Sequence, residues 1–334
     1  MTIKSYKEAI NEAIAQEMKK DDNVILIGED VAGGAGTNGE QDAWGGVMGV
    51  TKGLLGQFGR ERIIDTPITE TAILGMASGA ALTGLRPIVE LMFVDFMGVC
   101  FDQILNQTAK FRYMFGGKAI TPLTIRTMYG GGVRAASQHS QCLYPIFTHV
   151  PGIKVVIPSG PYDAKGLLIR CIRDNDPVIF LEHKAMYDVT EDVPDESYTI
   201  PFGEANFTRE GKDLTLIGMG KTVSLCNAAA DTLKKEGIHA TVLDLRTLSP
   251  LDEDSILESA EETGRIIIVD ESSPRCNIAT DISALICDKS FSYLKAPIKM
   301  ISPPHTPVPF SPALEDIYMP DEKTIVSTAK NILN

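Results

Sequence analysis

Short, largely apolar runs alternate with segments of helical periodicity, and this rhythm constrains the fold more than any other feature of the sequence. In the first half the runs are VILIG at 24–28, RIID at 62–65, PIVELMF at 87–93, PLTIRT at 122–127, KVVIP at 154–158 and PVIFLE at 177–182. Strands that are buried on both faces have continuous apolar runs, and helices between successive strands indicate parallel pairing. We therefore expect an α/β protein with doubly wound sheets.

The rhythm stops once and then resumes. Residues 187–201, YDVTEDVPDESYTIP, are acidic, contain proline and show no periodicity, which is typical of a linker. Strands and helices alternate again from DLTLIGMG at 213–220 to PIKMI at 297–301. Because 334 residues are many for one core, we predict two domains, residues 1–186 and 203–334, joined by a linker at 187–202.

The composition argues against several classes of partner. The net charge of −13 is spread along the chain and disfavours nucleic acid as a partner. No stretch reaches the roughly 18 uncharged apolar residues that a membrane span requires. Residues 1–20 carry charges of both signs and predict a folded helix rather than a signal peptide. The six cysteines lack the short spacings of a zinc site or a disulfide framework, so we expect a cytoplasmic protein.

Three side chains near predicted strand ends each allow two interpretations. Glu70 begins a helix of small apolar residues, either as a first-turn acid that stabilises the helix dipole or as a desolvated carboxyl that shares a proton with a ligand. Phe96 follows the strand at 87–93 and lies either in the core or at the ligand edge of the sheet. His139, in SQHSQ after a run of glycines, is either a surface histidine or a proton donor.

Two glycine motifs match known fingerprints incompletely. Gly34, Gly36 and Gly39 satisfy G-x-G-x-x-G, but several residues separate them from the preceding strand and a polar EQDAWGG follows. In LIGMGKT at 216–222, Thr215 stands where a phosphate-binding loop needs its first glycine. We interpret both motifs as ordinary loops.

A longer set of motifs resembles one family over practically the whole chain. In order they are GED at 28–30, DTPITE at 65–70, GLRPIVELMF at 84–93, SQHSQ at 137–141, HVPGIKVVIPS at 149–159, YDAKGLL at 162–168, IRDNDPVIFLE at 172–182 and LDLRTLSPLD at 243–252. Together they resemble the β subunits of the thiamine-diphosphate-dependent component of 2-oxo acid dehydrogenase complexes. The resemblance implies a transketolase-like pyrimidine-binding domain followed by a transketolase C-terminal-like domain, in an oxidoreductase subunit that is active only with an α subunit.

The resemblance also implies a cofactor. In that family the α subunit holds the diphosphate of thiamine diphosphate through Mg²⁺, and the β subunit holds the aminopyrimidine. The metal-binding G-D-G stretch of the α subunit is absent from this chain. Glu70 matches the glutamate that hydrogen-bonds the pyrimidine nitrogen and helps to activate the cofactor. Phe96 matches the aromatic ring packed on the pyrimidine, Ile68 and Met92 line the same pocket, and Glu29 matches a second acid on a proton path.

His139 matches a histidine on a mobile loop that faces the substrate and the incoming lipoyl group. There it protonates either an oxyanion or the lipoyl sulfur. The glycines before it would give the loop room to move. The implied partners are an α subunit, in an α2β2 heterotetramer, and a lipoyl-bearing acyltransferase component.

A structural site for a monovalent cation, usually K⁺, is a further implication. The carbonyls of Leu123, Cys171 and Ile172 and the side chains of Asp174 and Asp176 match it. The common form of the site has an amide where this chain has Asp176. A turn stabilised by the two aspartates is therefore an equal alternative.

Three functions stay open. Residues 36–54 and His305, in HTPVPFS, resemble the acetoin-cleaving members of the family, which split this ketol into acetaldehyde and an acetyl unit that passes oxidatively to lipoamide. Pyruvate or a branched-chain 2-oxo acid fits the same mechanism. The third function is a non-catalytic scaffold subunit that keeps the fold and only binds partners.

Overall fold

The computed structural model describes residues 2–32 and 45–333, and the chain folds into two compact units. Unit 1 comprises the chain up to residue 129 together with 146–156 and 160–201. Unit 2 comprises 130–145, 157–159 and the chain from 202 onward. Three segments of each unit alternate, so the chain passes between the units five times. Gly34, Gly36 and Gly39 lie outside the described residues, as does most of the 36–54 segment.

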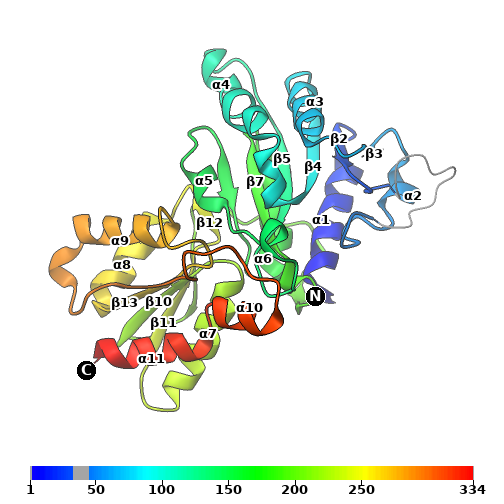
Figure 1. The fold of residues 1–334 in the computed structure, drawn as a ribbon. Coiled ribbons are helices and arrows are strands. Elements are labelled where there is room, and N and C mark those ends of the chain that lie inside the picture. Colours follow the sequence, from blue (N-terminus) through cyan, green and yellow to red (C-terminus); the bar gives the residue numbers. More distant parts are fainter. Residues whose placement is uncertain (1, 33–44, 334) are drawn as a thin grey trace. The chain divides into compact units, whose positions relative to one another are not determined.

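In the described part of unit 1, parallel strands form one sheet, of which Figure 1 labels β2, β3, β4, β5 and β7. They are β2 (Val24–Gly28), β3 (Ile63–Asp65), β4 (Arg86–Phe93), β5 (Thr124–Tyr129), β6 (Lys154–Val156) and β7 (Val178–His183). Within the unit their spatial order is β6-β7-β5-β4-β2-β3. The chain moves from β2 outward to β3 and then back to β4, so the topological switch point lies between β2 and β4.

Helices connect the strands of unit 1, largely as the sequence predicts. They are α1 (Tyr6–Lys20), α2 (Leu54–Phe58), α3 (Glu70–Leu82), α4 (Phe111–Met114), α6 (Pro161–Arg173) and the short turns η1 (Val94–Gly98), η2 (Gln103–Thr108) and η4 (Lys184–Met186). Ser5 caps α1, because Ser5 N donates to Glu8 Oε2 over 2.7 Å and Glu8 N donates to Ser5 Oγ over 3.3 Å. After β4, the chain forms a 3-10 turn, η1, and then a π-helical turn, η2.

The segment predicted as a linker contains a strand. β8 (Thr190–Val193) pairs antiparallel with β1 (Thr2–Ser5), and residues 160–201 belong to unit 1. Neither strand has an apolar run, because both form an exposed two-stranded ribbon. The sequence pattern of buried strands therefore does not reveal them.

Unit 2 has a second sheet, in the order β14-β13-β10-β11-β9. Its elements are β9 (Asn206–Arg209), β10 (Leu214–Gly218), α7 (Lys221–Lys234), β11 (Ala240–Asp244), β12 (Thr247–Ser249), α8 (Glu253–Thr263), β13 (Ile266–Val269), α9 (Ile278–Lys289), η5 (Phe291–Tyr293), β14 (Lys299–Ile301), α10 (Pro312–Tyr318) and α11 (Glu322–Leu333). The turn η3 (Ser137–His139) and the start of α5 (Tyr144–Thr148) also belong to it. The predicted strands are parallel, whereas the unpredicted edge strand β9 runs antiparallel to β11.

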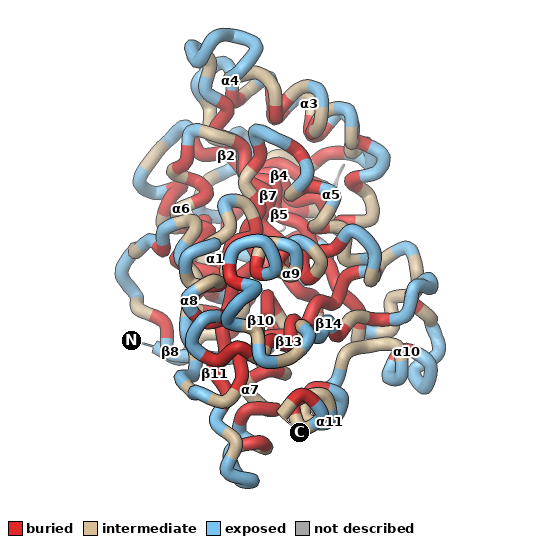
Figure 2. Tube along the Cα trace, turned by 90° about the vertical axis from the view of Figure 1, so that its left-hand side faces the viewer, coloured by how far each residue is buried: buried red, intermediate tan, exposed pale blue. Residues whose placement is uncertain are grey.

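The strands of both sheets form the cores of their units. Figure 2 shows β4, β5 and β7 of unit 1 and β10 and β13 of unit 2 as buried. In unit 2, Leu216, Val242 and Ile267 pack against side chains of α7 and α11. Burial on both faces explains why these strands are continuous apolar runs in the sequence. Within the described part of the chain, no helix has both the length and the apolarity of a membrane span.

Candidate active site

The topological switch point of unit 1 brings together the ends of three parallel strands. Gly28, the last residue of β2, pairs with Asp65 at the end of β3, and β2 also pairs with β4. Glu29 follows β2 directly, and Met92 is next to the last residue of β4. A Cβ on Gly28 would lie 2.8 Å from the carbonyl oxygen of Glu90, so glycine permits the close approach of the chains here. In open α/β sheets this edge is where ligands bind.

The segment from β3 to α3 adds an acid and an apolar side chain to this edge. Glu70 is the first residue of α3 and is half-buried, and Ile68, two residues earlier, is 73% exposed. Among the described residues, the buried atoms Asp65 Oδ2 and Thr66 Oγ1 have no hydrogen-bond partner. Buried polar atoms are normally satisfied. Orphaned acceptors beside an exposed isoleucine indicate a place for a polar ligand with an apolar face.

Glu70 affects the titration of two neighbouring groups. The pKa of Glu29 is raised above its ordinary value by burial, and then by the negative charges of Asp30 and Glu70. Burial, together with the charge of Glu70, raises the pKa of the Cys100 thiol to about 12. Glu29 and Glu70 therefore lie within electrostatic range of each other. A carboxyl whose pKa is raised by its surroundings suits proton transfer.

Aromatic rings complete this half of the site. Phe96, in η1, meets Phe93 edge to face, with ring centroids 5.5 Å apart and planes at 74°. The ammonium of Lys184 lies 5.4 Å from the centroid of Phe93. Phe96 and Met92 are both half-buried. Two carboxyls, an aromatic ring and apolar side chains fit an aminopyrimidine, which needs hydrogen bonds at its edge and stacking on its face.

His139 belongs to unit 2, whereas Glu29, Ile68, Glu70, Met92 and Phe96 belong to unit 1. It ends the 3-10 turn η3 and is half-buried. The sequence analysis predicts that the glycines before His139 let the loop move. Their conformations and contacts also give them a local structural role. Gly132 has a φ of +88°, and a Cβ on Gly131 would lie 2.7 Å from Met319 Sδ. The glycines therefore serve a left-handed turn and close packing.

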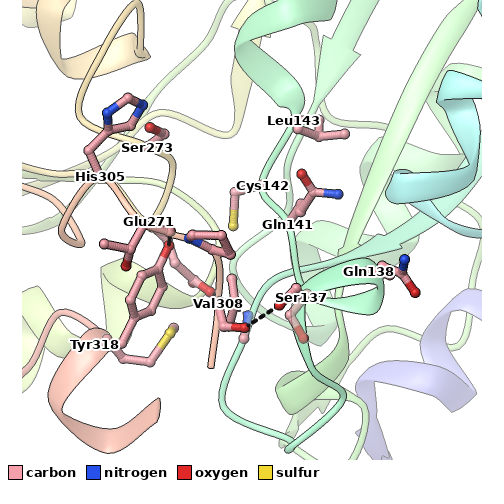
Figure 3. A pocket seen from close by; sticks show the side chains of 15 residues that line it. Ser137, Gln138, Gln141, Cys142, Leu143, Glu271, Ser273, His305, Val308 and Tyr318 are labelled. Atoms are coloured by element: carbon pink, nitrogen blue, oxygen red, sulfur yellow. Dashed lines mark hydrogen bonds between the residues drawn. The ribbon is translucent and has the colours of Figure 1, made fainter. Parts of the chain in front are cut away.

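A pocket of about 610 Å³ lies within unit 2 beside His139 (Figure 3). Its walls come from the residues on both sides of His139, from the segments after β13 and β14, and from α10. His305 lines it, as does Cys142. Tyr318 lines it too, and burial, with smaller contributions from Cys142 and Glu271, raises the pKa of this phenol to about 12. His305 and the His139 loop thus border one cavity.

Two residues that the sequence analysis did not select contact the His139 loop. Glu271, after β13, accepts from Gly131 N over 2.8 Å. Glu315, in α10, accepts from Gly132 N over 2.7 Å. These partners lie 140 and 183 residues along the chain from the glycines. Nothing in the local sequence distinguishes the two glutamates from surface acids, so only the fold reveals them.

The backbone part of the predicted cation site is already hydrogen-bonded. The carbonyl of Leu123 accepts from Val178 N over 2.9 Å, and that of Cys171 accepts from Asp174 N over 3.1 Å. The carbonyl of Ile172 accepts from the guanidinium of Arg86 over 3.1 Å. Each carbonyl keeps a second lone pair, so the carboxylates decide whether an ion fits.

Both carboxylates of this site have cationic partners within the chain. Lys154 Nζ lies 2.9 Å from Asp174 Oδ1 and 3.0 Å from Asp176 Oδ2. Arg112 pairs with Asp176, and Arg170 lies 3.2 Å from Asp174 Oδ2. Burial opposes ionisation of Asp176, but Lys154 and Arg112 hold its pKa below the usual range. The geometry does not fit a bound ion, because an ammonium lies between the two carboxylates. Among the described residues, no cluster of three or more His, Cys, Asp or Glu side chains forms a metal site.

Comparison with known families covers both units. The model for "Transketolase, pyrimidine binding domain" matches residues 4–190, and the model for "Transketolase, C-terminal domain" matches residues 203–325. A solved structure described as a split-gene transketolase, an inactive β4 tetramer, aligns with a TM-score of 0.78 over 98% of each chain. Its sequence identity is 20%, so this likeness concerns the fold alone. The predicted fold class is confirmed.

Curated relatives match over nearly their full length. The β subunit of an acetoin:2,6-dichlorophenolindophenol oxidoreductase from Cupriavidus necator is 62% identical, over 98% of this chain and 97% of its own. The protein of that description from Bacillus subtilis is 60% identical with the same coverage. The β subunit of the pyruvate dehydrogenase E1 component from Bacillus subtilis is 45% identical, again over 98% and 97%.

Proposed function

The chain belongs to the family of β subunits of acetoin and 2-oxo acid dehydrogenases, and from this premise we propose that it is the β subunit of an acetoin dehydrogenase. The observation that carries the choice of substrate is the identity of 60–62% to two acetoin oxidoreductase β subunits, against 45% to a pyruvate dehydrogenase β subunit. His305, which resembles the acetoin-cleaving members, lines the pocket beside the His139 loop and supports that choice.

In the proposed reaction, the bond between the carbinol and carbonyl carbons of acetoin breaks. One two-carbon half leaves as acetaldehyde. The other is oxidised to an acetyl group, and its two electrons reduce a lipoyl disulfide, so that one sulfur carries the acetyl group and the other a proton. Thiamine diphosphate, when bound, supplies the electron sink that such a cleavage needs.

The residues of unit 1 have binding and proton-holding roles in this proposal. Glu70 hydrogen-bonds the ring nitrogen of the pyrimidine, and Phe96 packs on the ring face. Ile68 and Met92 exclude water from its apolar side. Glu29 holds its proton to a higher pH than an exposed glutamate does, because burial raises its pKa, and passes it along the acidic edge of the site.

His139 is the proton donor of unit 2 in this proposal. An imidazole changes its charge near neutral pH, so it can protonate the carbonyl oxygen of the substrate or the departing lipoyl sulfur. The loop conformation supports a functional position, because Arg134 and Ala136 have φ values of 62° and 61°. Backbone strain of this kind clusters at functional sites.

The proposal includes an α subunit, in an α2β2 assembly, that holds the diphosphate through Mg²⁺, and a lipoyl-bearing acyltransferase as acceptor. The relatives' description as β subunits supports an α partner. So do exposed apolar side chains, such as Tyr113 at 89% and Val99 at 64% in unit 1 and Ile317 at 81% in unit 2. None of the six cysteines, all of which lie in the described part of the chain, forms a disulfide, and this supports a cytoplasmic location.

Reconstitution with the α subunit tests the function. The α and β chains, supplied with thiamine diphosphate and Mg²⁺, are assayed with acetoin and with pyruvate, with dichlorophenolindophenol as electron acceptor. We expect reduction of the dye with acetoin and little with pyruvate. A rate confined to pyruvate would favour the pyruvate dehydrogenase alternative.

The scaffold alternative is tested with two variants in the same assay. Glu70→Ala should lose activity by roughly 100-fold or more, because a proton-transfer group typically contributes 10²–10⁴-fold. His139→Ala should also lose activity, while assembly with the α subunit is retained. Full activity in both variants would support a non-catalytic role for this chain.

A further inference from the structure

Within unit 2, one buried carboxylate holds the first part of the His139 loop. Glu315 Oε1 accepts from Gly132 N over 2.7 Å. Its Oε2 accepts from Arg134 N over 3.1 Å and from the Arg134 guanidinium over 2.6 Å. Glu315 has no solvent exposure. Burial of a charged carboxylate is costly, and these charge-assisted hydrogen bonds offset that cost only while the loop keeps this conformation.

The helix that carries Glu315 is built in an unusual way. In α10, Glu315 is the one buried residue, whereas the apolar residues Leu314 and Ile317 are 58% and 81% exposed. An ordinary surface helix buries its apolar face and exposes its acids. A main contribution of α10 to unit 2 is therefore the delivery of a buried carboxylate to the loop.

Glu271 holds the neighbouring amide. Its Oε1 accepts from Gly131 N over 2.8 Å, and its side chain is also buried. Successive backbone N–H groups of a glycine-rich loop commonly bind a phosphate or another external anion. Here the two glutamates take that place, so these amides serve to fix the loop rather than to bind a ligand.

The fixed segment leads directly to the candidate proton donor. Arg134 and Ala136 are both in the left-handed region, which residues with a Cβ rarely adopt. Ser137 Oγ then donates to the carbonyl of Val308 over 2.8 Å, and the turn η3 ends at His139. Contacts at both ends of this short segment hold a backbone conformation that it would not keep by itself.

We propose that Glu315 is a positioning residue for His139, which fixes the loop so that the imidazole is presented to the substrate. The proposal rests on the proposed function, in which His139 donates a proton. Glu315 touches neither substrate nor cofactor in this proposal and acts through the loop alone.

Hydrogen exchange of the isolated chain tests whether Glu315 fixes the loop, without any assumption about activity. In Glu315→Gln, one of the two accepting oxygens becomes an NH2 group, which cannot accept from the loop, and the remaining carbonyl oxygen carries no charge to pair with Arg134. We expect the amides of Gly132 and Arg134 to exchange at least tenfold faster than in the wild type, with no change in β10 or β13. Exchange at the wild-type rate in the loop would overturn the proposal.

A double-mutant comparison in the reconstituted enzyme tests whether Glu315 affects activity through His139. We expect kcat with acetoin to fall about tenfold or more in Glu315→Gln, with KM changed less than twofold. We also expect the variant His139→Ala/Glu315→Gln to be no slower than His139→Ala, because a residue that acts through His139 has no effect in its absence. Independent, multiplying losses would show a general structural role and overturn the proposal.

Two further variants complete the design. Asp316→Asn removes an exposed partner of Arg134 from the same helix, and we expect its activity to stay within twofold of the wild type. If Glu315→Gln does not fold, Arg134→Gln removes the charge-assisted bond from the loop side and should show the same dependence on His139. Loss of activity in His139→Ala with normal activity in Arg134→Gln and Glu315→Gln would overturn the positioning role alone. Full activity in His139→Ala would count against the proposed function instead.

Discussion

Lys154 illustrates how one side chain can replace an ion. Its ammonium lies between the carboxylates of Asp174 and Asp176, where the predicted K⁺ would need its negative ligands. The aspartate at 176, in place of the amide of related sites, supplies the second carboxylate of this pair. A tethered ammonium is present at any salt composition, whereas the stabilisation by a bound ion rises with the logarithm of its concentration above its Kd.

We expect the melting temperature of the isolated chain to be the same in potassium chloride and in choline chloride of equal ionic strength. The reason is that Lys154, Arg112 and Arg170 already balance the charge of both carboxylates. Thermal melts in the two salts measure this, and Lys154→Met should melt at a lower temperature in both. A saturable rise of the wild-type melting temperature with K⁺ would contradict the expectation.

Asp176 should also give a recognisable pH dependence. Its pKa in the folded chain lies below the ordinary value of 3.8, so its ion pairs stabilise the fold above about pH 4. That stabilisation is lost as the pH falls through the lower, folded pKa. We expect Asp176→Asn to be less stable than the wild type at pH 6, with the difference shrinking below pH 4. Urea unfolding between pH 3 and 7 measures it, and a constant difference would argue against the ion pairs.

Arg126 in β5 is a buried cation of unit 1 and holds two carboxylates. It donates to Glu90 over 2.9 Å and to Glu182 over 2.6 and 2.9 Å. Arg126→Met leaves two buried acids without their cation and should cost about 3–5 kcal/mol of unfolding free energy. The control Arg209→Met breaks an exposed pair with Asp231 and should cost less than about 1 kcal/mol. Urea titrations compare them, and equal losses would contradict the argument.

Side chains that follow buried strands could be predicted from the sequence, and those that act across long separations could not. Glu29 and Glu70 each come after a recognisable apolar run, so the parallel sheet places them at one edge. Their electrostatic coupling then follows from the fold class. Glu315 has no such signal, because it lies in a short helix whose exposed neighbours give it the pattern of a surface acid.

Among the elements, the ribbon of β1 and β8 depends on a buried lysine. Lys165 of α6 has no solvent exposure. Its Nζ donates to Glu12 over 2.8 Å and to the carbonyls of Pro194 and Asp195 over 2.5 and 3.1 Å. These contacts attach the acidic 187–201 segment to α1 and α6 and explain why it is ordered despite its linker composition.

Lys165→Met should loosen this segment. It removes the ammonium that donates to the Glu12 carboxylate and to the part-buried carbonyls of Pro194 and Asp195, and should cost about 1–3 kcal/mol. We expect faster proteolysis between residues 190 and 198, measured by mass spectrometry of limited digests. Lys7→Met, which breaks an exposed pair with Asp188, is the matched control and should digest at the wild-type rate. Cleavage of Lys165→Met at the wild-type rate would show that Lys165 does not order the 187–201 segment.

Elements with two buried faces were predictable, and edge elements were not. Runs such as VILIG and PIVELMF form β2 and β4 within a residue or two of their predicted bounds. β9 was missed because its side chains alternate between intermediate and exposed and include few apolar groups. The π-helical η2 depends on tertiary contacts, including a hydrogen bond of 2.5 Å between Ser78 and Thr108, which no local pattern reveals.

At the scale of the whole molecule, the chain is interleaved rather than divided once. Unit 2 includes residues 130–145 and 157–159, which the predicted boundary assigns to the first domain. Within the unit, Tyr144 donates to Asp270 over 2.5 Å, and Ser159 pairs with Asp244. The composition of the sequence reveals only the acidic, proline-containing segment that we predicted as a linker. The other crossings lie in ordinary loops beside strands.

A fragment of residues 203–334 should therefore be unstable, because it lacks the donors that these inserted segments give to buried carboxylates. We expect no cooperative urea transition, or one at a much lower midpoint than the full chain. Glu315→Gln should change stability to urea in opposite directions in the two chains. It should stabilise the fragment, where the acid lacks its loop partners, and destabilise the full chain, where it has them. A fragment as stable as the full chain would contradict this.

The separation of 183 residues between Gly132 and Glu315 also has a consequence for biosynthesis. The chain is synthesised at about 5–20 residues per second, so Glu315 is added roughly ten seconds or longer after the His139 loop. The strands of unit 1 can pair in that interval, while the loop stays without its anchor. A nascent chain that is interrupted before α10 therefore has the strands of unit 1 but lacks the carboxylate that fixes the His139 loop.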